Sequence, residues 1–290
     1  MSKIYAIVTH PGSAHKDEFL ACCVLLALHP VSITRREVQN CDLDDPRLCV
    51  LDVGQRHQPE LYNFDHHQFP REQTPTCSLS LVLKHLGLYE DAREFCEWLE
   101  VAEWFDCRGP VSTAQWLGVE RECVNKLNSP IDISLLKRFS QSVRVEPGQP
   151  LWEIMRMIGE DLLGYVQGLR DRLIFIGKHA QLWNLGNEGL GAEVLFLPRT
   201  DPLPDDPASG LERYVDHQGL SGRIVGVVYP DSRGQGYGLS RFRDHPHFDF
   251  LRVAKDPSVH FAHARGFMAK TSSTDPVFLQ SLLVSAVSTK

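Results

Sequence analysis

Two short apolar runs, separated by a segment of helical composition, constrain the fold of this chain more than any other feature. Residues 3–9 and 48–53 are rich in apolar and β-branched side chains and have the length of buried strands. Residues 17–28 contain helix-forming side chains and begin with two acids, which suit a helix amino terminus. A strand, a helix and a second strand at this spacing indicate a parallel sheet with helices on its faces.

The rest of the chain indicates a second domain. The longest helical pattern covers residues 151–176, where apolar side chains recur at helical spacing. Strand-like runs separated by turns follow it, and a helical segment at residues 276–287 closes the chain. These expected strands are residues 192–197, 224–228, 236–242 and 259–262. We therefore expect an α/β domain in residues 1–180, with a parallel sheet and helices on both faces, and a smaller α+β domain in residues 181–290.

The charge of the chain is unevenly distributed. The 290 residues carry a formal charge of −7, of which residues 241–290 contribute +3 and residues 1–240 contribute −10. This balance excludes a protein that coats nucleic acid without regard to sequence, because such binding depends on neutralising many phosphates. Hydrophobic residues make up 42% and charged residues 23%, so the chain is not globally disordered.

The amino terminus and the cysteines both favour a cytoplasmic location. Residues 1–10 lack a basic stretch followed by a long apolar run, as a signal peptide would have, and no apolar run approaches the ~18 residues of a membrane span. The eight cysteines contain no Cys-x-x-Cys pair and are expected to be reduced and buried. We expect a soluble, cytoplasmic protein without a membrane partner.

Side chains that bind metal ions follow the predicted strands and helices, at the edge where ligands collect in parallel sheets. A mixed set of imidazoles and carboxylates suits Mn²⁺, Zn²⁺ or Fe²⁺ better than Mg²⁺ or Ca²⁺. Because these ligands are too many for one tetrahedral ion, we expect two ions bridged by the carboxylate of Asp52 or Asp106. The candidates are His10, His15 and Asp17 after the first strand, Asp52 at the end of the second, Asp65, His66 and His67 in the next turn, and Asp106 at the end of a predicted helix.

Each candidate also has a purely structural explanation. His10 precedes Pro-Gly and could be a turn histidine, Asp52 could cap the turn after its strand, and Asp106 could be a surface acid. Adjacent histidines such as His66 and His67 are common in solvated loops. Their occurrence together, at successive strand and helix ends, favours a functional site.

These residues resemble the DHH phosphoesterase superfamily, and in detail its Myg-type family of metal-dependent exonucleases and hydrolases. The similar stretches are THPGSAHKDE at residues 9–18, LDVG at 51–54, FDHHQ at 64–68 and HFAHARGF at 260–267. The resemblance implies a DHH-type metal-binding catalytic domain in residues 1–180 and a substrate-binding domain in residues 181–290.

The resemblance also implies a role for each candidate. It implies a manganese enzyme that hydrolyses a phosphodiester or phosphoanhydride through a metal-activated hydroxide, with Asp52 bridging two ions. Asp65 and His67 would orient ligands or contact substrate, and His67 could assist the leaving group as a general acid. The implied metal ligands are His10, His15, Asp17, Asp52, His66 and Asp106, and the catalytic candidates are Asp52, Asp65 and His67.

Five residues of the second domain are candidates for contact with a substrate phosphate. The resemblance implies this role for His263 and Arg265, and Gly266 would let the backbone approach a ligand closely. Arg241 and Arg243 alternate on a predicted strand, so both would lie on one face and could hold a phosphate between them. An ordinary solvated strand is the alternative for these two arginines.

We therefore expect a metal-dependent phosphodiesterase or exonuclease that acts on a short single-stranded nucleic acid or a small nucleotide. Two Mn²⁺ ions are the expected cofactor, with other divalent transition metals as alternatives. Bound cations would attract the substrate phosphate despite the acidic charge of the chain. A hydrolase of inorganic pyrophosphate or of a nucleotide phosphoanhydride is the first alternative. A non-catalytic metal or nucleotide sensor is the second, and the occupancy of every ligand position speaks against it.

Overall fold

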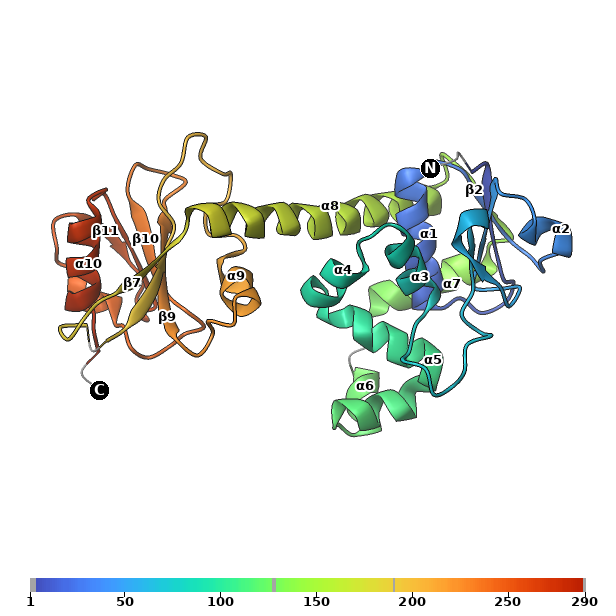
Figure 1. Cartoon of the computed structure of the whole chain (residues 1–290), viewed down its shortest axis with the longest axis horizontal. Coiled ribbons are helices and arrows are strands. Elements are labelled where there is room, and N and C mark those ends of the chain that lie inside the picture. The colour runs from blue at the N-terminus through green and yellow to red at the C-terminus, as the bar shows by residue number, and fades with distance from the viewer. Residues whose placement is uncertain (1–3, 127–128, 190, 289–290) are drawn as a thin grey trace. The chain divides into compact units, whose positions relative to one another are not determined.

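The chain forms two compact units, residues 1–168 and 169–290 (Figure 1). The structure is a computed structural model that describes residues 4–126, 129–189 and 191–288. The division between the units lies inside helix α8 (Pro150–His179), earlier than the boundary expected at residue 180. Each unit contains one six-stranded sheet, and the described ranges include ten α-helices. The catalytic and substrate-binding roles of the two units stay predictions.

The sheet of the first unit is parallel at its centre, as predicted, and antiparallel at both edges. Its strand order is β4-β5-β3-β1-β2-β6. The neighbours from β5 to β2 run parallel, whereas β4 and β6 pair antiparallel with β5 and β2. The strands are β1 (Ala6–Thr9), β2 (Ser32–Arg35), β3 (Leu48–Leu51), β4 (His57–Gln58), β5 (Asn63–Phe64) and β6 (Arg144–Val145). Residue 3 of the first predicted strand lies outside the described residues.

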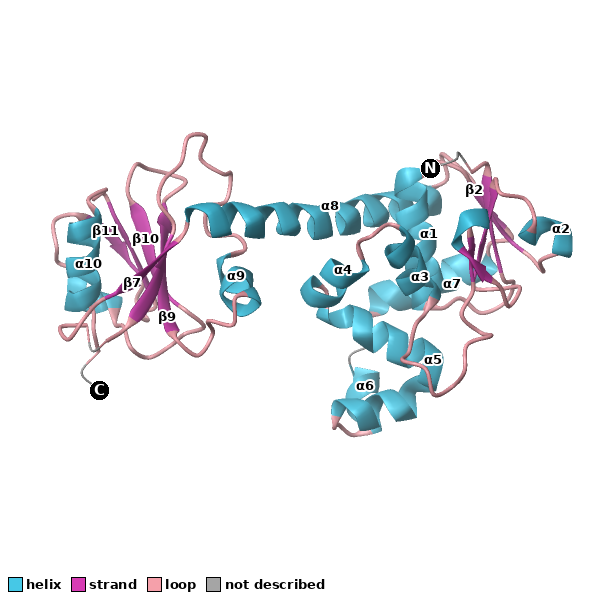
Figure 2. Cartoon of the chain, in the orientation of Figure 1, coloured by secondary structure: helices cyan, strands magenta, loops and turns pink. Residues whose placement is uncertain are grey.

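Helices lie on both faces of this sheet, as Figure 2 shows. Successive strand residues point to opposite faces. Val8 accordingly packs with Leu43 of α2, whereas the hydroxyl of Thr9 donates to Glu18 of α1. The helical elements are α1 (Lys16–Leu28), α2 (Asn40–Leu43), η1 (Pro59–Leu61), α3 (Ser78–His85), α4 (Tyr89–Phe95), α5 (Glu97–Leu117), α6 (Arg121–Lys126) and α7 (Pro130–Gln141).

Within the first unit, α8 packs directly against the backbone of α1. A Cβ atom on Gly159 would lie 1.9 Å from the carbonyl oxygen of Cys23. Only glycine therefore permits this close approach. The contact holds α1, which carries the candidate metal ligand Asp17, against a long helix.

The second unit contains a mostly antiparallel sheet with the order β11-β12-β10-β9-β8-β7, in which β8 and β9 run parallel. Helix α10 packs on one face through Leu279 and Leu283, and α9 packs on the other through Leu211 and Val215 (Figure 2). The four predicted strands are present, while β7 and β12 were not predicted. The elements are β7 (Gln181–Asn184), β8 (Glu193–Phe196), α9 (Leu211–His217), β9 (Ile224–Pro230), β10 (Tyr237–Arg241), η2 (Phe250–Val253), β11 (Val259–Ala262), β12 (Met268–Thr271) and α10 (Pro276–Ser285).

The cysteines are all free, and five of the eight are buried. Cys41 and Cys123 are exposed, so the expectation of burial is wrong for these two. Across the described part of the chain, no helix has the length and apolar character needed to cross a membrane. The cytoplasmic location stays a prediction.

Candidate metal centre

The residues predicted to bind metal ions follow the carboxyl ends of the parallel strands. His10 comes directly after β1, Asp52 after β3, and Asp65 after β5. Asp52 has a φ of 56°, a left-handed conformation that is uncommon for a residue with a side chain. Such strained backbone persists where the surrounding structure holds it, and it is frequent at functional sites.

A buried ion pair organises the loop that carries His10 and His15. The carboxylate of Glu18 lies fully buried and accepts from Arg35 Nη2 at 3.2 Å. Arg35 also donates to the carbonyl oxygens of Gly12 at 3.1 Å and Ser13 at 2.9 Å. The backbone N–H of His15 donates to Glu18 at 3.3 Å, which caps helix α1. Glu18 and Arg35, neither of them predicted as site residues, therefore fix the first loop.

Of the four carboxylates in the described residues that leave a buried oxygen without a hydrogen-bond donor, three lie at this site and the fourth is Glu193 in the second unit. The three atoms at this site are Asp17 Oδ1, Asp52 Oδ2 and Asp106 Oδ2. His10 Nε2 lies 3.4 Å from Asp52 Oδ2, and His66 Nε2 lies 3.0 Å from Asp106 Oδ2, but neither contact has hydrogen-bond geometry. Since a buried anionic oxygen without a donor is costly, these atoms fit the coordination of cations.

The ring of His66 lies between two of these carboxylates. Its Nε2 atom is 3.0 Å from Asp52 Oδ1 and 3.0 Å from Asp106 Oδ2. One ring nitrogen carries at most one proton, and only its contact with Asp52 has hydrogen-bond geometry. A nitrogen and two carboxylate oxygens at such separations are ligands that one divalent transition-metal ion could share.

The electrostatics of the site show an excess of negative charge in a small volume. Burial, followed by the charges of Asp52 and Asp106, raises the pKa of the Asp17 carboxyl. The adjacent carboxylates of Asp52 and Glu18 raise the pKa of His10 to about 10. The carboxylates therefore favour positive charge on the adjacent imidazole. Bound divalent cations would supply more positive charge than a protonated imidazole does.

The structure brings all eight predicted residues of this unit together. Their ligand atoms form four overlapping groups in which the atoms of each group lie within 4.8 Å of one another. Cys107, which was not predicted, joins His66 and Asp106 in one group. Asp106 lies three residues before Gly109, whose non-helical φ of 74° breaks α5 into two helices, so the expected helix end lies close to Asp106. The groups are Asp52, Asp65, His66 and His67; His10, His15 and Asp52; His66, Asp106 and Cys107; and His15, Asp17 and Asp106.

Asp65 has a different environment from the other acids, because both of its oxygens accept hydrogen bonds. Oδ1 accepts from His67 Nδ1 at 2.7 Å, and Oδ2 accepts from the backbone N–H of Gln55 at 2.5 Å. The hydrogen bond that His67 donates to Asp65 also raises the pKa of His67, whose side chain is half exposed. Asp65 thus orients His67 at the rim of the site.

Ser78 is a further site residue that the sequence analysis missed. Its hydroxyl donates to Asp52 Oδ1 at 2.8 Å, and its backbone N–H donates to Asp17 Oδ2 at 3.2 Å. Ser78 is fully buried at the first turn of α3. It orients two carboxylates so that their other oxygens remain free. A serine at a helix start is common in any sequence, so no local signal marks this residue.

The arginines of the second unit differ in placement from the expectation. Arg241 ends β10, and its Nε atom donates to the carbonyl oxygen of Phe248 at 2.6 Å. Arg243 lies beyond the strand with a φ of 46° and forms an ion pair with Asp216. The prediction that both arginines share one strand face is therefore wrong, because the chain turns after Arg241.

His263, Arg265 and Gly266 lie in the turn between β11 and β12. The backbone N–H of Gly266 donates to the carbonyl oxygen of His263 at 2.7 Å. Gly266 has a φ of 68°, and a Cβ atom there would lie 2.1 Å from Asp249 Oδ1 and 3.7 Å from an Nη2 atom of Arg241. The backbone at Gly266 thus approaches the side chain of Asp249 closely, and this approach requires glycine. The turn and Arg241 lie near each other, and their contact with substrate stays a prediction.

Residues 6–90 match the MYG1 exonuclease family. This family is described as an uncharacterised protein family (UPF0160). The matched range includes His10, Asp17, Asp52 and His66, whereas Asp106 lies beyond it. The Myg-type resemblance is therefore supported over this part of the chain, and the DHH superfamily stays a prediction.

Individual relatives match over stretches of similar length. The chain is 42% identical over 95 residues to MYG1 exonuclease from Rattus norvegicus, and 35% identical over 95 residues to that from Mus musculus. It is 34% identical over 98 residues to a MYG1 protein from Schizosaccharomyces pombe. These matches cover 28–30% of this chain, and the chain spans only 25–29% of the length of the curated relatives.

One solved structure aligns over nearly the full length of the chain. It is the pGpG-specific phosphodiesterase PggH from Vibrio cholerae. Its sequence is 13% identical to this chain, and the alignment covers 98% of each of the two chains. The TM-score of 0.33 is too low to establish a shared fold.

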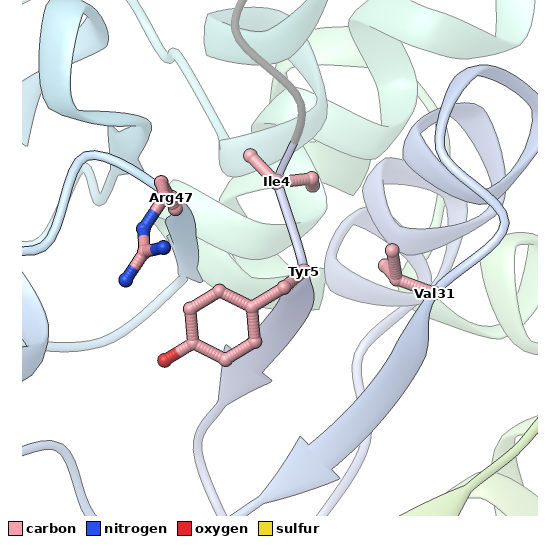
Figure 3. A pocket seen from close by; sticks show the side chains of 4 residues that line it. All are labelled: Ile4, Tyr5, Val31 and Arg47. Atoms are coloured by element: carbon pink, nitrogen blue, oxygen red, sulfur yellow. The ribbon is translucent and has the colours of Figure 1, made fainter.

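The described part of the first unit includes two cavities. One of about 260 Å³ adjoins the metal-binding candidates and includes His66, His67 and Asp106 among its lining residues. The other, of about 480 Å³, is lined by Ile4, Tyr5, Val31 and Arg47 (Figure 3). These four residues precede β1, β2 and β3, so the second cavity lies at the amino ends of the strands.

Proposed function

We propose that this protein is a phosphohydrolase dependent on divalent metal ions, with Mn²⁺ as the preferred ion. It cleaves a phosphodiester bond in a short single-stranded nucleic acid or a small nucleotide. The observation that carries this proposal is the set of buried carboxylate oxygens without donors on Asp17, Asp52 and Asp106, next to three histidine rings. The family match over residues 6–90 supports the same class of reaction.

The donor set fits two transition-metal ions. Asp52 belongs both to the group with His10 and to the group with His66, which suits a bridging carboxylate. Bound divalent ions would lower the pKa of a coordinated water and stabilise negative charge on a phosphoryl oxygen. The ligands would be His10, His15, Asp17, Asp52, His66 and Asp106.

The chain's own residues prepare this centre in two ways. Ser78 donates to one oxygen of Asp52 and one of Asp17, which orients both carboxylates and leaves the second oxygen of each without a donor. Asp65 holds Nδ1 of His67, which leaves Nε2 of the half-exposed ring available for a proton. Because Asp65 favours the protonated ring, His67 would donate that proton to the leaving oxygen as a general acid.

The test is a comparison of Asp52→Asn with the wild type in the presence of Mn²⁺. Short RNA, short single-stranded DNA, linear dinucleotides and pyrophosphate are assayed in parallel, and bound metal is measured on the same protein. We expect the variant to lose phosphodiesterase activity and bound metal while its thermal unfolding curve stays cooperative. Asp45→Asn, a change in a surface acid paired with Arg47, serves as the control and should retain both. Full activity of Asp52→Asn, or hydrolysis of pyrophosphate alone, would contradict the proposal.

A further inference from the structure

The cavity beside the candidate metal centre combines metal-binding residues with positive charge. His66 and Asp106 form part of its wall, and Arg71 and Arg108 form another part. Asp106 is the only acid among its lining residues, and its carboxylate already faces the rings of His15 and His66. The lining set is His66, His67, Phe69, Pro70, Arg71, Gln73, Thr74, Pro75, Thr76, Asp106, Cys107 and Arg108.

Arg108 fixes the wall of this cavity. Its Nη2 atom donates to the carbonyl oxygens of Arg71 and, at 2.6 Å, of Gln73, and its Nη1 atom donates to the carbonyl oxygen of Cys107 at 3.2 Å. A guanidinium has five N–H donors. Two of them, on Nε and Nη1, therefore have no partner within the described residues. Arg108 ties residues 71–73 to helix α5 and still offers donors to a ligand.

Arg71 supplies a second guanidinium, and it belongs to residues 71–73, the segment that Arg108 ties to helix α5. Its side chain is exposed, and the described residues place no carboxylate within ion-pair distance of it. The backbone carbonyl oxygen of Arg71 accepts from Arg108, which keeps this residue in the cavity wall. An anion in the cavity could accept charge-assisted hydrogen bonds from both guanidinium groups.

We propose that this cavity binds a second phosphate of the substrate, namely the one next to the phosphodiester that is cleaved. This inference rests on the proposed function and names the substrate class more closely. Phe69, Pro70 and Pro75 give the cavity an apolar portion that suits a nucleoside. Its volume is small for a ligand pocket, which fits one nucleotide unit. The preferred substrate is therefore a dinucleotide or oligonucleotide with a further phosphate.

The kinetic test compares the dinucleotide TpT with its terminally phosphorylated forms pTpT and TpTp, with the corresponding uridine dinucleotides in parallel. We expect one terminal phosphate to lower KM about tenfold or more, as a charge-assisted contact would. Arg71→Gln should remove that preference with little change in kcat, and Arg71→Lys should restore part of it. Arg47→Gln, in the cavity at the opposite strand ends, should leave the preference intact.

A binding measurement separates this inference from the proposed function. Calorimetry uses analogues of the same dinucleotides with a non-hydrolysable methylenephosphonate link, in the presence of Mn²⁺. We expect the terminal phosphate to tighten binding to the wild type about tenfold and to have no effect on Arg71→Gln. Equal affinity with and without the terminal phosphate overturns the inference, whether or not the protein hydrolyses phosphodiesters. Tighter binding without any hydrolysis supports the subsite and overturns the proposed activity.

Discussion

The hydroxyl of Ser78 donates a hydrogen bond of 2.8 Å to Oδ1 of Asp52, although 26 positions of the chain separate the two residues. The same serine uses its backbone N–H to hold Asp17. Two acids on different elements thus share one buried donor residue. Their remaining oxygens, Asp17 Oδ1 and Asp52 Oδ2, have no donor within the described residues.

Replacement of Ser78 should therefore weaken the metal centre. Ser78→Ala removes the hydrogen bond that orients Asp52, and the loss of such an outer partner costs about 10- to 100-fold in metal affinity or activity. Titration with Mn²⁺ followed by calorimetry measures this change. Ser134→Ala, on the surface of α7, is the control and should bind Mn²⁺ as the wild type does. Unchanged affinity in Ser78→Ala would show that packing alone orients the carboxylate.

The stability of the metal-free protein should fall as the pH rises above neutrality. Asp52 and Glu18 raise the pKa of His10 from 6.5 to about 10. A raised pKa of a base contributes stability that is fully present below pH 6.5 and is lost as the pH approaches 10. Urea unfolding at several pH values, with a chelator present, measures the decline. His10→Gln should flatten it, and an equally steep decline in that variant would exclude His10 as its source.

The affinity for Mn²⁺ should change in the opposite direction over the same pH range. A metal ion binds the neutral imidazole and competes with its proton, so the affinity rises as His10 loses that proton. Calorimetric titrations with Mn²⁺ at pH 7 and pH 9 test this expectation. An affinity that falls with pH would indicate that His10 is not a ligand.

Glu103 should contribute strongly to the stability of the first unit. Its carboxylate is fully buried and accepts from Ser80 at 2.6 Å, Tyr89 at 2.7 Å and Arg93 at 2.8 Å. Glu103→Gln should lower the free energy of unfolding by about 1.5–3 kcal/mol, as expected for hydrogen bonds to a charged group. Glu100→Gln alters an exposed partner of the same arginine and should cost only about 0–1 kcal/mol. Equal losses in the two variants, by urea unfolding, would refute this assignment.

A side chain at Gly266 should destabilise the second unit. The φ of 68° is strained for any other residue, and a Cβ atom at this position would lie only 2.1 Å from Asp249 Oδ1, which leaves no room for a methyl group. Gly266→Ala should cost roughly 1–3 kcal/mol through strain and overpacking. Gly234→Ala is the matched control, because a Cβ there meets no atom within 4 Å. A thermal unfolding curve of Gly266→Ala that matches the control would contradict the close contact.

The sequence by itself determined where the candidate ligands lie. Apolar runs that lead to His10 and Asp52, with a helical segment between them, predict two strands of one parallel sheet. Their carboxyl ends must then share one edge of the sheet, and the structure places these two side chains 3.4 Å apart there. This inference needed only local pattern and a general rule of chain topology.

Only the tertiary structure decided which groups complete the site. Glu18 and Arg35 form a buried pair, and Ser78 reaches Asp17 across 61 positions, because α1, α3 and β2 pack together. Arg243 leaves its predicted strand face since the backbone turns left-handed after β10. Hydrogen bonds between distant segments depend on how the whole core packs, and no short window of sequence specifies that packing. Local sequence patterns therefore predicted the order of these elements. They did not predict which partner each charged side chain contacts.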